Sequence, residues 1–183
     1  MRIGGGNARG RRLAAPAGGA VRPTSGRVRR SLFDILLHGE PGLAEARVLD
    51  AFAGTGALGL EALSRGAATA TFFDIDRTAL EALRANVAAL GAGSRAFVRP
   101  ADATRPPRAD APADIVMLDP PYRSGLGGKA LAALAAAGWI GAGTLVAWEQ
   151  GSAFPEAAPE GFTEIDRRRY GGTTLVFLRR AAS

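Results

Sequence analysis

The segment Asp119-Pro120-Pro121-Tyr122 contains the residue types that say most about chemistry in this chain. It directly follows the apolar run 115–118, which predicts a strand buried in a parallel sheet. Two consecutive prolines stiffen the backbone and remove two N–H donors. The segment is therefore expected to present two fixed acceptors, the Asp119 carboxylate and the Pro120 carbonyl, beside the aromatic ring of Tyr122.

Such an arrangement suits a reaction at the exocyclic amino nitrogen of a nucleic-acid base. The lone pair of that nitrogen is delocalised into the base, so the nitrogen is a poor nucleophile. Two acceptors that bind its hydrogens aim the lone pair at an electrophile, and positioning then supplies most of the rate. We expect Asp119 to accept the surplus proton and Tyr122 to stack on a base turned out of its helix or loop. The alternative is a rigid turn with no catalytic role.

A glycine-rich turn at residues 50–59 follows the first strand predicted in the core. Gly54, Gly56 and Gly59 match the GxGxxG motif, and Asp74 follows Gly54 at the spacing of a dinucleotide-binding fold. Such a turn brings the backbone close to a ligand. By itself the motif is equally compatible with a nicotinamide cofactor, and a glycine turn that binds nothing is a further alternative.

Asp50, just before this turn, favours a different ligand. A carboxylate there suits the ammonium group of an amino-acid ligand and would repel a pyrophosphate. We therefore expect a cofactor that carries an amino acid, and the side of the turn that binds it is predicted to consist of Asp50, Phe52, Gly54 and Gly56.

Acidic residues also end the next two predicted strands. In a doubly wound sheet the carboxyl ends of neighbouring strands meet one ligand. Asp74 is expected to accept the ribose hydroxyls of an adenosine, with Ile75 packed against the adenine, whereas Asp76 could cap the following helix. Asp102 is expected to bind the adenine amino group and the Ala103 amide a ring nitrogen; otherwise Asp102 is an exposed loop acid.

Strand and helix patterns alternate through the middle of the chain. Apolar runs predict strands over residues 46–51, 69–74, 95–98, 115–118 and 143–149, and helices over residues 27–37, 58–65, 77–90 and 128–137. Two β-rich segments, 162–170 and 173–179, flank Gly171-Gly172 and predict a hairpin. The fold expected is α/β: a doubly wound, mostly parallel seven-stranded sheet of the Rossmann-like kind, with a C-terminal antiparallel hairpin and a basic N-terminal extension.

The charge of the chain is unevenly distributed. Its formal net charge is +6, yet residues 1–30 contain eight arginines and no acid, which leaves 15 basic and 17 acidic residues for 31–183. A basic arm on a nearly neutral body favours a polyanionic partner such as nucleic acid, although a solubilising tail is the alternative. The arginines predicted to contact nucleic acid are Arg9, Arg11, Arg12, Arg22, Arg27, Arg29 and Arg30.

Other compositional features exclude whole classes of protein. The chain has no cysteine and a single histidine, His38, so disulfides, thiolate metal sites and histidine metal clusters are excluded. It shows neither an apolar run long enough to cross a membrane nor a secretory signal, so a cytoplasmic location is expected. We expect residues 1–38 to form a basic arm and helix that contacts RNA, and residues 39–183 to form the catalytic domain.

Taken together, these segments resemble the small bacterial 16S rRNA (guanine-N2)-methyltransferases, a family of class I methyltransferases that use S-adenosylmethionine. The similarity runs in the same order from Arg2 to about Leu178. The resembling segments are Arg2-Ile3-Gly4-Gly5-Gly6, Arg9-Gly10-Arg11, Arg22-Pro23-Thr24, Arg27-Val28-Arg29, Leu32-Phe33-Asp34, 52–67, 116–122 and Tyr170-Gly171-Gly172.

The resemblance implies methyl transfer to N2 of a guanine in 16S rRNA, within a particle of small ribosomal subunit assembly. It implies S-adenosyl-L-methionine as cofactor, no metal, and a role for residues 24–33, Thr24 included, in holding RNA or closing over the cofactor. We expect a monomer. Two departures from the family pattern occur: Gly26 stands where an acid is usual, and Asp74 stands where glutamate is usual.

Three alternatives stay open at this point. An NAD-linked oxidoreductase would account for the glycine motif, but no hydride-transfer residues are evident. A DNA amino-methyltransferase acting on adenine N6 or cytosine N4 would share the chemistry, but commonly needs an added recognition region for which this chain has no room. A non-enzymatic RNA-binding assembly protein would not need the intact segment 119–122.

Overall fold

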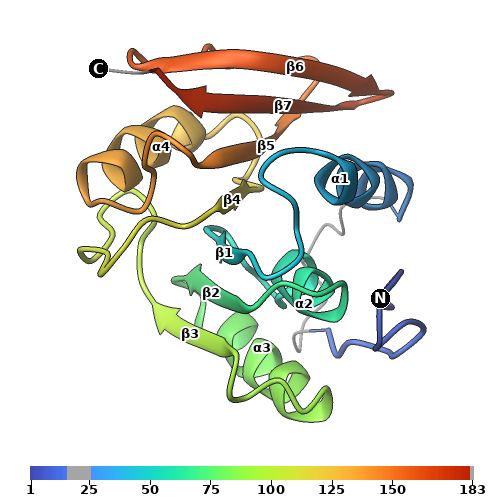
Figure 1. Cartoon of the computed structure of the whole chain (residues 1–183). Helices are drawn as coiled ribbons and strands as arrows, with labels where there is room; N and C mark the ends of the chain where they lie inside the picture. The colour runs from blue at the N-terminus through green and yellow to red at the C-terminus, as the bar shows by residue number, and fades with distance from the viewer. Residues whose placement is uncertain (16–25, 182–183) are drawn as a thin grey trace.

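In the computed structural model, which describes residues 1–15 and 26–181, a seven-stranded sheet forms the centre of the molecule (Figure 1). The strand order is β3-β2-β1-β4-β5-β7-β6. Strands β1 to β5 run parallel to one another, and β7 is antiparallel to both β5 and β6. The strands are β1 (Arg47–Asp50), β2 (Thr69–Asp74), β3 (Ala96–Pro100), β4 (Ile115–Leu118), β5 (Leu145–Gly151), β6 (Phe162–Tyr170) and β7 (Thr173–Arg180).

Helices cover both faces of the sheet, as Figure 1 shows. Helices α1 (Gly26–His38), α2 (Ala57–Ser64) and α3 (Arg77–Ala89) share one hydrophobic cluster with one face, and α4 (Leu126–Ala136) packs in a second cluster on the other. The predicted α/β fold with a doubly wound sheet and a C-terminal hairpin is therefore confirmed.

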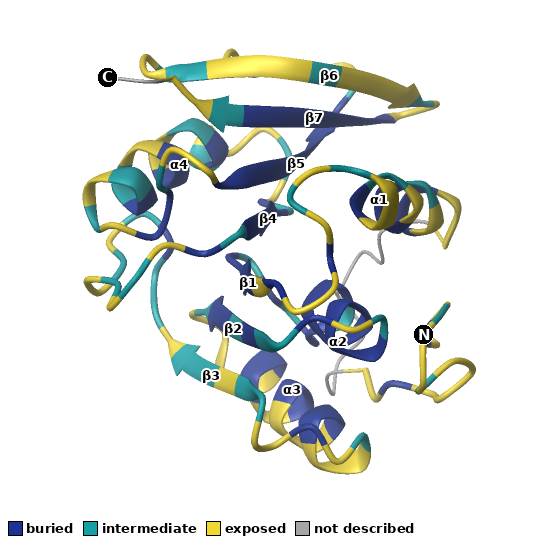
Figure 2. Ribbon diagram, viewed as in Figure 1, coloured by how far each residue is buried: buried dark blue, intermediate teal, exposed yellow. Residues whose placement is uncertain are grey.

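Burial falls steeply from the centre of the sheet to its β6 edge (Figure 2). Every residue of β4 and β5 is buried, which accounts for the uninterrupted apolar run in β4. Strand β6 is mostly exposed, and its charged side chains suit a solvent-facing edge. Within the described residues, no helix is long and apolar enough to cross a membrane.

The described part of the N-terminal arm folds back onto the helices. An antiparallel bridge joins Arg2 to Arg12, and the side chains of Ile3 and Leu13 are buried in the cluster that contains α1, α2 and α3. The predicted RNA contacts Arg22 and Thr24 lie outside the described residues.

Helix α3 begins at a capping residue. The Asp76 carboxylate accepts hydrogen bonds from the backbone N–H groups of Thr78 and Ala79, at 2.7 and 3.1 Å. These bonds and one from the Thr78 hydroxyl lower the pKa of Asp76. The interpretation of Asp76 as a helix cap is confirmed, and α3 is therefore fixed at the end of β2.

Candidate cofactor and active site

A cavity of about 420 Å³ opens at the carboxyl edge of the parallel strands. Its walls come from the segments that follow β1, β2, β3 and β4, as expected for a doubly wound sheet. The lining residues are Ala51, Phe52, Gly54, Asp74, Ile75, Asp76, Ala101, Asp102, Ala103, Thr104, Asp119, Pro121 and Leu126. Most of the cofactor residues predicted from the sequence are therefore brought together in one place.

Asp74 combines a structural contact with an open position on the cavity wall. One carboxylate oxygen accepts the Gly54 N–H at 2.7 Å, and the other accepts the Asp76 N–H at 2.8 Å. These bonds join the end of β2 to the glycine turn. Each carboxylate oxygen has further acceptor capacity, so Asp74 can still bind hydroxyl groups of a ligand. The neighbouring Ile75 side chain is 75% exposed and lines the cavity, which suits packing against a purine.

Asp102 and Ala103 form the cavity wall after β3. The Asp102 Oδ1 atom accepts hydrogen bonds from the Thr104 hydroxyl and backbone N–H, at 2.7 and 2.8 Å. These two bonds lower the pKa of Asp102, which is therefore an anion at neutral pH. The Ala103 side chain is buried. The expected contacts of both residues with an adenine stay predictions.

Asp50 lies beneath the glycine turn and is not among the residues that line the cavity, and its expected contact with an ammonium group stays a prediction. Its Oδ2 atom accepts the Gly59 N–H at 2.9 Å, whereas its buried Oδ1 atom has no hydrogen-bond partner among the described residues. Burial raises the pKa of Asp50 to about 7, and the charges of Asp119 and Asp74 add to the shift. An unpaired buried acceptor is costly, so this atom is a suitable partner for a cationic group of a ligand.

Gly56 does not line the cavity either, although it was predicted to contact the cofactor. It stands at the N-cap of α2 with a φ of 82°, a backbone conformation that favours glycine. A Cβ atom on Gly56 would lie 2.2 Å from Leu83 Cδ1, and one on Gly59 would lie 2.3 Å from the Phe72 ring. Both glycines therefore let α2 pack closely on β2 and α3, and Gly54 and Phe52 form the cavity wall of the turn.

Residues 119–122, which follow β4, differ in whether they line the cavity. Asp119 and Pro121 line the cavity, and Pro120 is buried behind them. Tyr122 is not among the lining residues. Its hydroxyl donates to Glu149 Oε1 at 2.9 Å and lies 3.1 Å from Thr173 Oγ1.

The environment of Tyr122 restricts what its ring can do. A Cβ atom on Gly151 would lie 2.9 Å from the ring, so one side of the ring packs against the end of β5. Burial raises the pKa of Tyr122 to about 12, with Glu149 adding to the shift, so the hydroxyl stays a donor at neutral pH. Base stacking by Tyr122 stays a prediction, and only the side away from Gly151 is suited to it.

Glu149 and Thr173 are two residues of this site that the sequence interpretation missed. Glu149 is the last residue of the predicted strand 143–149, so its place at the carboxyl edge could have been inferred. Thr173 begins the second strand of the hairpin, and no local pattern marks it as a partner of Tyr122. Leu126, at the start of α4, was also missed as a cavity residue.

The charge of the site favours a cationic ligand. The carboxylates of Asp50, Asp74 and Asp119 are close enough that the latter two raise the pKa of the first. A pyrophosphate would be repelled there, whereas an ammonium or a sulfonium group would be attracted. Among the described residues, no three acidic or histidine side chains form a group that could hold a metal ion.

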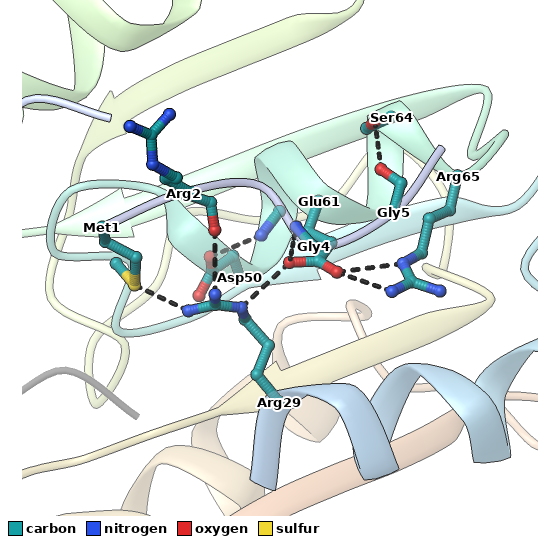
Figure 3. Close-up of polar contacts among 10 residues, drawn as sticks. Met1, Arg2, Gly4, Gly5, Arg29, Asp50, Glu61, Ser64 and Arg65 are labelled. Atoms are coloured by element: carbon teal, nitrogen blue, oxygen red, sulfur yellow. Dashed lines mark hydrogen bonds and ion pairs between the residues drawn. The ribbon is translucent and has the colours of Figure 1, made fainter. Parts of the chain in front are cut away.

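Arg29 is the clear exception among the predicted RNA contacts (Figure 3). Its side chain is buried, and its Nε atom donates to Glu61 Oε2 at 2.9 Å. Its Nη2 atom donates to the Arg2 carbonyl at 2.9 Å. Glu61 also pairs with Arg65 and accepts the Gly4 N–H. Arg29 therefore ties the arm and α1 to α2 and is not available to RNA.

The other predicted arginines within the described residues are exposed: Arg9, Arg11, Arg12, Arg27 and Arg30. Arg11 donates to the Ala89 carbonyl at the end of α3, which places one basic residue of the arm beside that helix. The structure thus leaves five of these arginines accessible, and their contact with RNA stays a prediction.

Replacing Arg29 by alanine is expected to lower the free energy of unfolding by about 3 kcal/mol, because it deprives buried Glu61 of one cationic partner. Urea denaturation measures this, and the exposed neighbour Arg30→Ala is the control, with an expected change below about 0.5 kcal/mol. Equal stability of the two variants would show that the buried pair contributes little.

Comparison with solved structures identifies the class. A structure described as a putative methyltransferase yhhF from Escherichia coli matches with a TM-score of 0.86 and 37% identity, covering 100% of this chain and 99% of that one. The fold is also that of an RNA methyltransferase from Salinibacter ruber in complex with S-adenosyl-L-homocysteine, at a TM-score of 0.65, 16% identity, and coverage of 88% and 95%. The chain is a class I methyltransferase.

Sequence comparison narrows this class to a family. Residues 1–179 match the family described as conserved hypothetical protein 95, and the chain belongs to it. A curated relative, ribosomal RNA small subunit methyltransferase D of Escherichia coli strain K12, is 43% identical over 140 residues, which are 76% of this chain and 69% of the relative. The resemblance seen in the sequence is confirmed, and the NAD-linked oxidoreductase was a wrong alternative.

Proposed function

We propose that this protein transfers a methyl group from S-adenosyl-L-methionine to the exocyclic N2 amino group of a guanine in 16S rRNA. The observation that carries the proposal is the placement of Asp119 and Pro121 on the wall of the cavity, with Pro120 between them. The name of the curated relative, which refers to small-subunit ribosomal RNA, supports the choice of substrate. The substrate is taken to be 16S rRNA or a small-subunit assembly particle, and the protein to act as a monomer.

The cavity fits the cofactor in both shape and charge. Ile75 offers an apolar surface for the adenine, Asp102 an anionic acceptor for its amino group, and Asp74 acceptor capacity for the ribose. The unpaired Oδ1 atom of Asp50 is the expected partner of the ammonium group. When bound, S-adenosyl-L-methionine supplies an electrophilic methyl group, whose bond to sulfur breaks as a bond to the acceptor nitrogen forms.

The chain contributes positioning and proton acceptance. The Asp119 carboxylate and the Pro120 carbonyl hold the two hydrogens of the amino group, which orients its lone pair toward the cavity. The nitrogen carries a surplus proton after it forms its new bond, and Asp119 accepts that proton. Tyr122 is held by Glu149 and Thr173, so its ring is fixed next to Asp119 and Pro121 in the chain before the base arrives. In this proposal residues 1–38 contact RNA and residues 39–183 carry out catalysis.

Mapping of the methylated nucleoside tests this function. The protein is incubated with radiolabelled cofactor and either bare 16S rRNA, small ribosomal subunits or duplex DNA, and the products are digested to nucleosides. Label in N2-methylguanosine from one of the two RNA substrates is expected, with Asp119→Ala protein as the control. Label in N6-methyladenosine or N4-methylcytidine, or transfer to DNA alone, would refute the proposal, and absence of all transfer would favour a non-enzymatic RNA-binding role.

A further inference from the structure

A second cavity, of about 510 Å³, lies between α1 and the edge strand β6, apart from the cofactor cavity. Helix α1 contributes Ser31, Asp34 and His38 to its walls, and β6 contributes Arg168 and Tyr170. None of these residues has a role in the cofactor site described above. We call this cavity the α1–β6 groove.

The groove opens on the same side of the sheet as the Tyr122 hydroxyl. In the register of the hairpin, Tyr170 pairs with Thr173 and Arg168 pairs with Leu175. Side chains of directly paired residues point to the same face of a sheet, so Arg168 and Tyr170 share the face of Thr173. Because Thr173 Oγ1 lies 3.1 Å from the Tyr122 hydroxyl, one end of the groove adjoins the segment proposed to hold the base.

Beyond the groove, the same face of α1 carries two arginines toward the carboxyl edge of the parallel strands. Arg27, Arg30, Asp34 and His38 follow one another at helical spacings of three and four, so they share one face of α1. Arg179, near the end of β7, donates to the Glu40 carbonyl just beyond α1. The end of α1 is therefore near the far end of β7, and Arg27 lies toward the edge that carries the active site.

One arginine in the groove, Arg168, and two beside it on α1, Arg27 and Arg30, are placed to bind phosphates. Arg27 and Arg30 are exposed and make no ion pair among the described residues. Arg168 pairs with Asp166 at 2.8 Å, with side chains 52% and 38% exposed. Exposed pairs of this kind contribute little stability, so a phosphate can replace the carboxylate at small cost. An arginine fork binds phosphate oxygens bidentately, and Tyr170 offers an aromatic surface beside it.

Asp34 indicates which nucleic acid the groove suits. A carboxylate opposes phosphate but accepts a hydrogen bond from a ribose 2′-hydroxyl, a group that DNA lacks. Its position among arginines on α1 therefore favours an RNA strand, with phosphates at the arginines and a ribose at Asp34.

We propose that the α1–β6 groove binds the sugar–phosphate backbone of the RNA strand that flanks the target nucleotide, through Arg27, Arg30 and Arg168. This inference deepens the proposed function and rests on it. It assigns an RNA-binding role to the C-terminal hairpin as well as to the N-terminal segment, so the strand is held from two sides beside the active site.

The test compares Arg30→Ala with Arg168→Ala, each and combined, against the matched control Arg84→Ala with Arg108→Ala. Arg84 and Arg108 are exposed arginines on α3 and in the loop before β4, and the control removes the same charge. Binding to a 16S rRNA transcript and to small ribosomal subunits is measured at several salt concentrations. Each groove variant should weaken binding about fivefold and lower the salt slope by about 0.7. In the control variant, the affinity and the salt slope should change only by the small amount expected from the lower net charge.

Further readouts separate this inference from the proposed function. Cofactor affinity and thermal melting should match the wild type in all variants, and in methylation assays KM for RNA should rise while kcat stays the same. If the combined groove variant bound both RNA substrates with the same salt slope as the wild type, the inference would be overturned, even if the wild type methylates guanine N2. Lower slopes would support the groove even if the methylated base proved to be another one.

The assignment of Asp34 has its own readout. An RNA oligonucleotide should bind more tightly than DNA of the same sequence, and Asp34→Ala should narrow that difference to within about twofold. An unchanged ratio in Asp34→Ala would show that the carboxylate does not contact a ribose hydroxyl.

Discussion

Replacing Asp119 by alanine is expected to lower kcat for methyl transfer about a thousandfold, while the dissociation constant of the cofactor changes less than about threefold. The loss removes one of two acceptors that position the amino group, and also the group that takes its proton, which together account for roughly 4 kcal/mol. Asp119 is a separate lining residue of the cavity, so the substitution leaves the proposed adenosine contacts of Ile75 and Asp102 in place.

A second substitution at Asp119 separates the positioning of the amino group from the acceptance of its proton. Asp119→Asn keeps an acceptor oxygen but cannot take the proton, so its kcat should lie between those of the wild type and the alanine variant. Asp110→Ala removes an exposed acid from the loop before β4 and serves as the control for charge. Single-turnover methylation gives the rate and calorimetry the cofactor affinity. A cofactor affinity reduced as strongly as the rate would show that Asp119 binds the cofactor rather than the base.

Replacing Asp50 by asparagine should stabilise the protein without cofactor above pH 7 and at the same time weaken cofactor binding about a hundredfold. Burial raises the pKa of Asp50 from 3.8 to about 7. Between these values the folded state holds a proton that the unfolded state releases, so stability falls as the pH rises. At pH 8 the penalty is roughly 4 kcal/mol, and asparagine does not incur it.

Urea denaturation without cofactor at pH 5 and pH 8 measures this effect. The stability advantage of Asp50→Asn should be larger at pH 8 by a few kcal/mol. Asp102→Asn is the control, because hydrogen bonds from Thr104 lower the pKa of Asp102 and its titration is complete below pH 5. A pH-independent difference between wild type and Asp50→Asn would contradict a raised pKa.

Cofactor binding gives the opposite pH dependence. The affinity of the wild type should rise from pH 6 to pH 8, because only ionised Asp50 can pair with an ammonium group. This rise should be absent in Asp50→Asn. If the variant kept both the affinity and the rise, the cofactor would not contact the buried Oδ1 atom.

Much of the cofactor site could be predicted because its residues follow strands. Asp74, Asp102 and Asp119 each come just after a run of apolar residues, and parallel strands place such positions at one edge. The helix cap at Asp76 was equally local, since its partners are two and three residues away. Predictions of this kind depend only on short spacings and on the rule that governs parallel sheets.

Arg29 shows where such inference fails, although a signal existed. Arg29, Leu32 and Phe33 lie at helical spacing, so Arg29 shares the buried face of α1. Glu61 likewise stands within an apolar helix, where an acid needs a partner. Only the packing of α1 against α2 brings Arg29 and Glu61 together. Because of this contact, Arg29 is a buried structural residue and not the RNA-binding residue that was predicted.

The Asp119–Tyr122 segment also has features that the sequence predicts and contacts that only the tertiary structure decides. The sequence by itself determined that a rigid set of acceptors follows a buried strand, because prolines and apolar runs act locally. Only the tertiary structure decided that the Tyr122 hydroxyl binds Glu149 and Thr173, the latter 51 residues away. Such contacts depend on which strands become neighbours and on which face each side chain points to, and no local spacing contains that information.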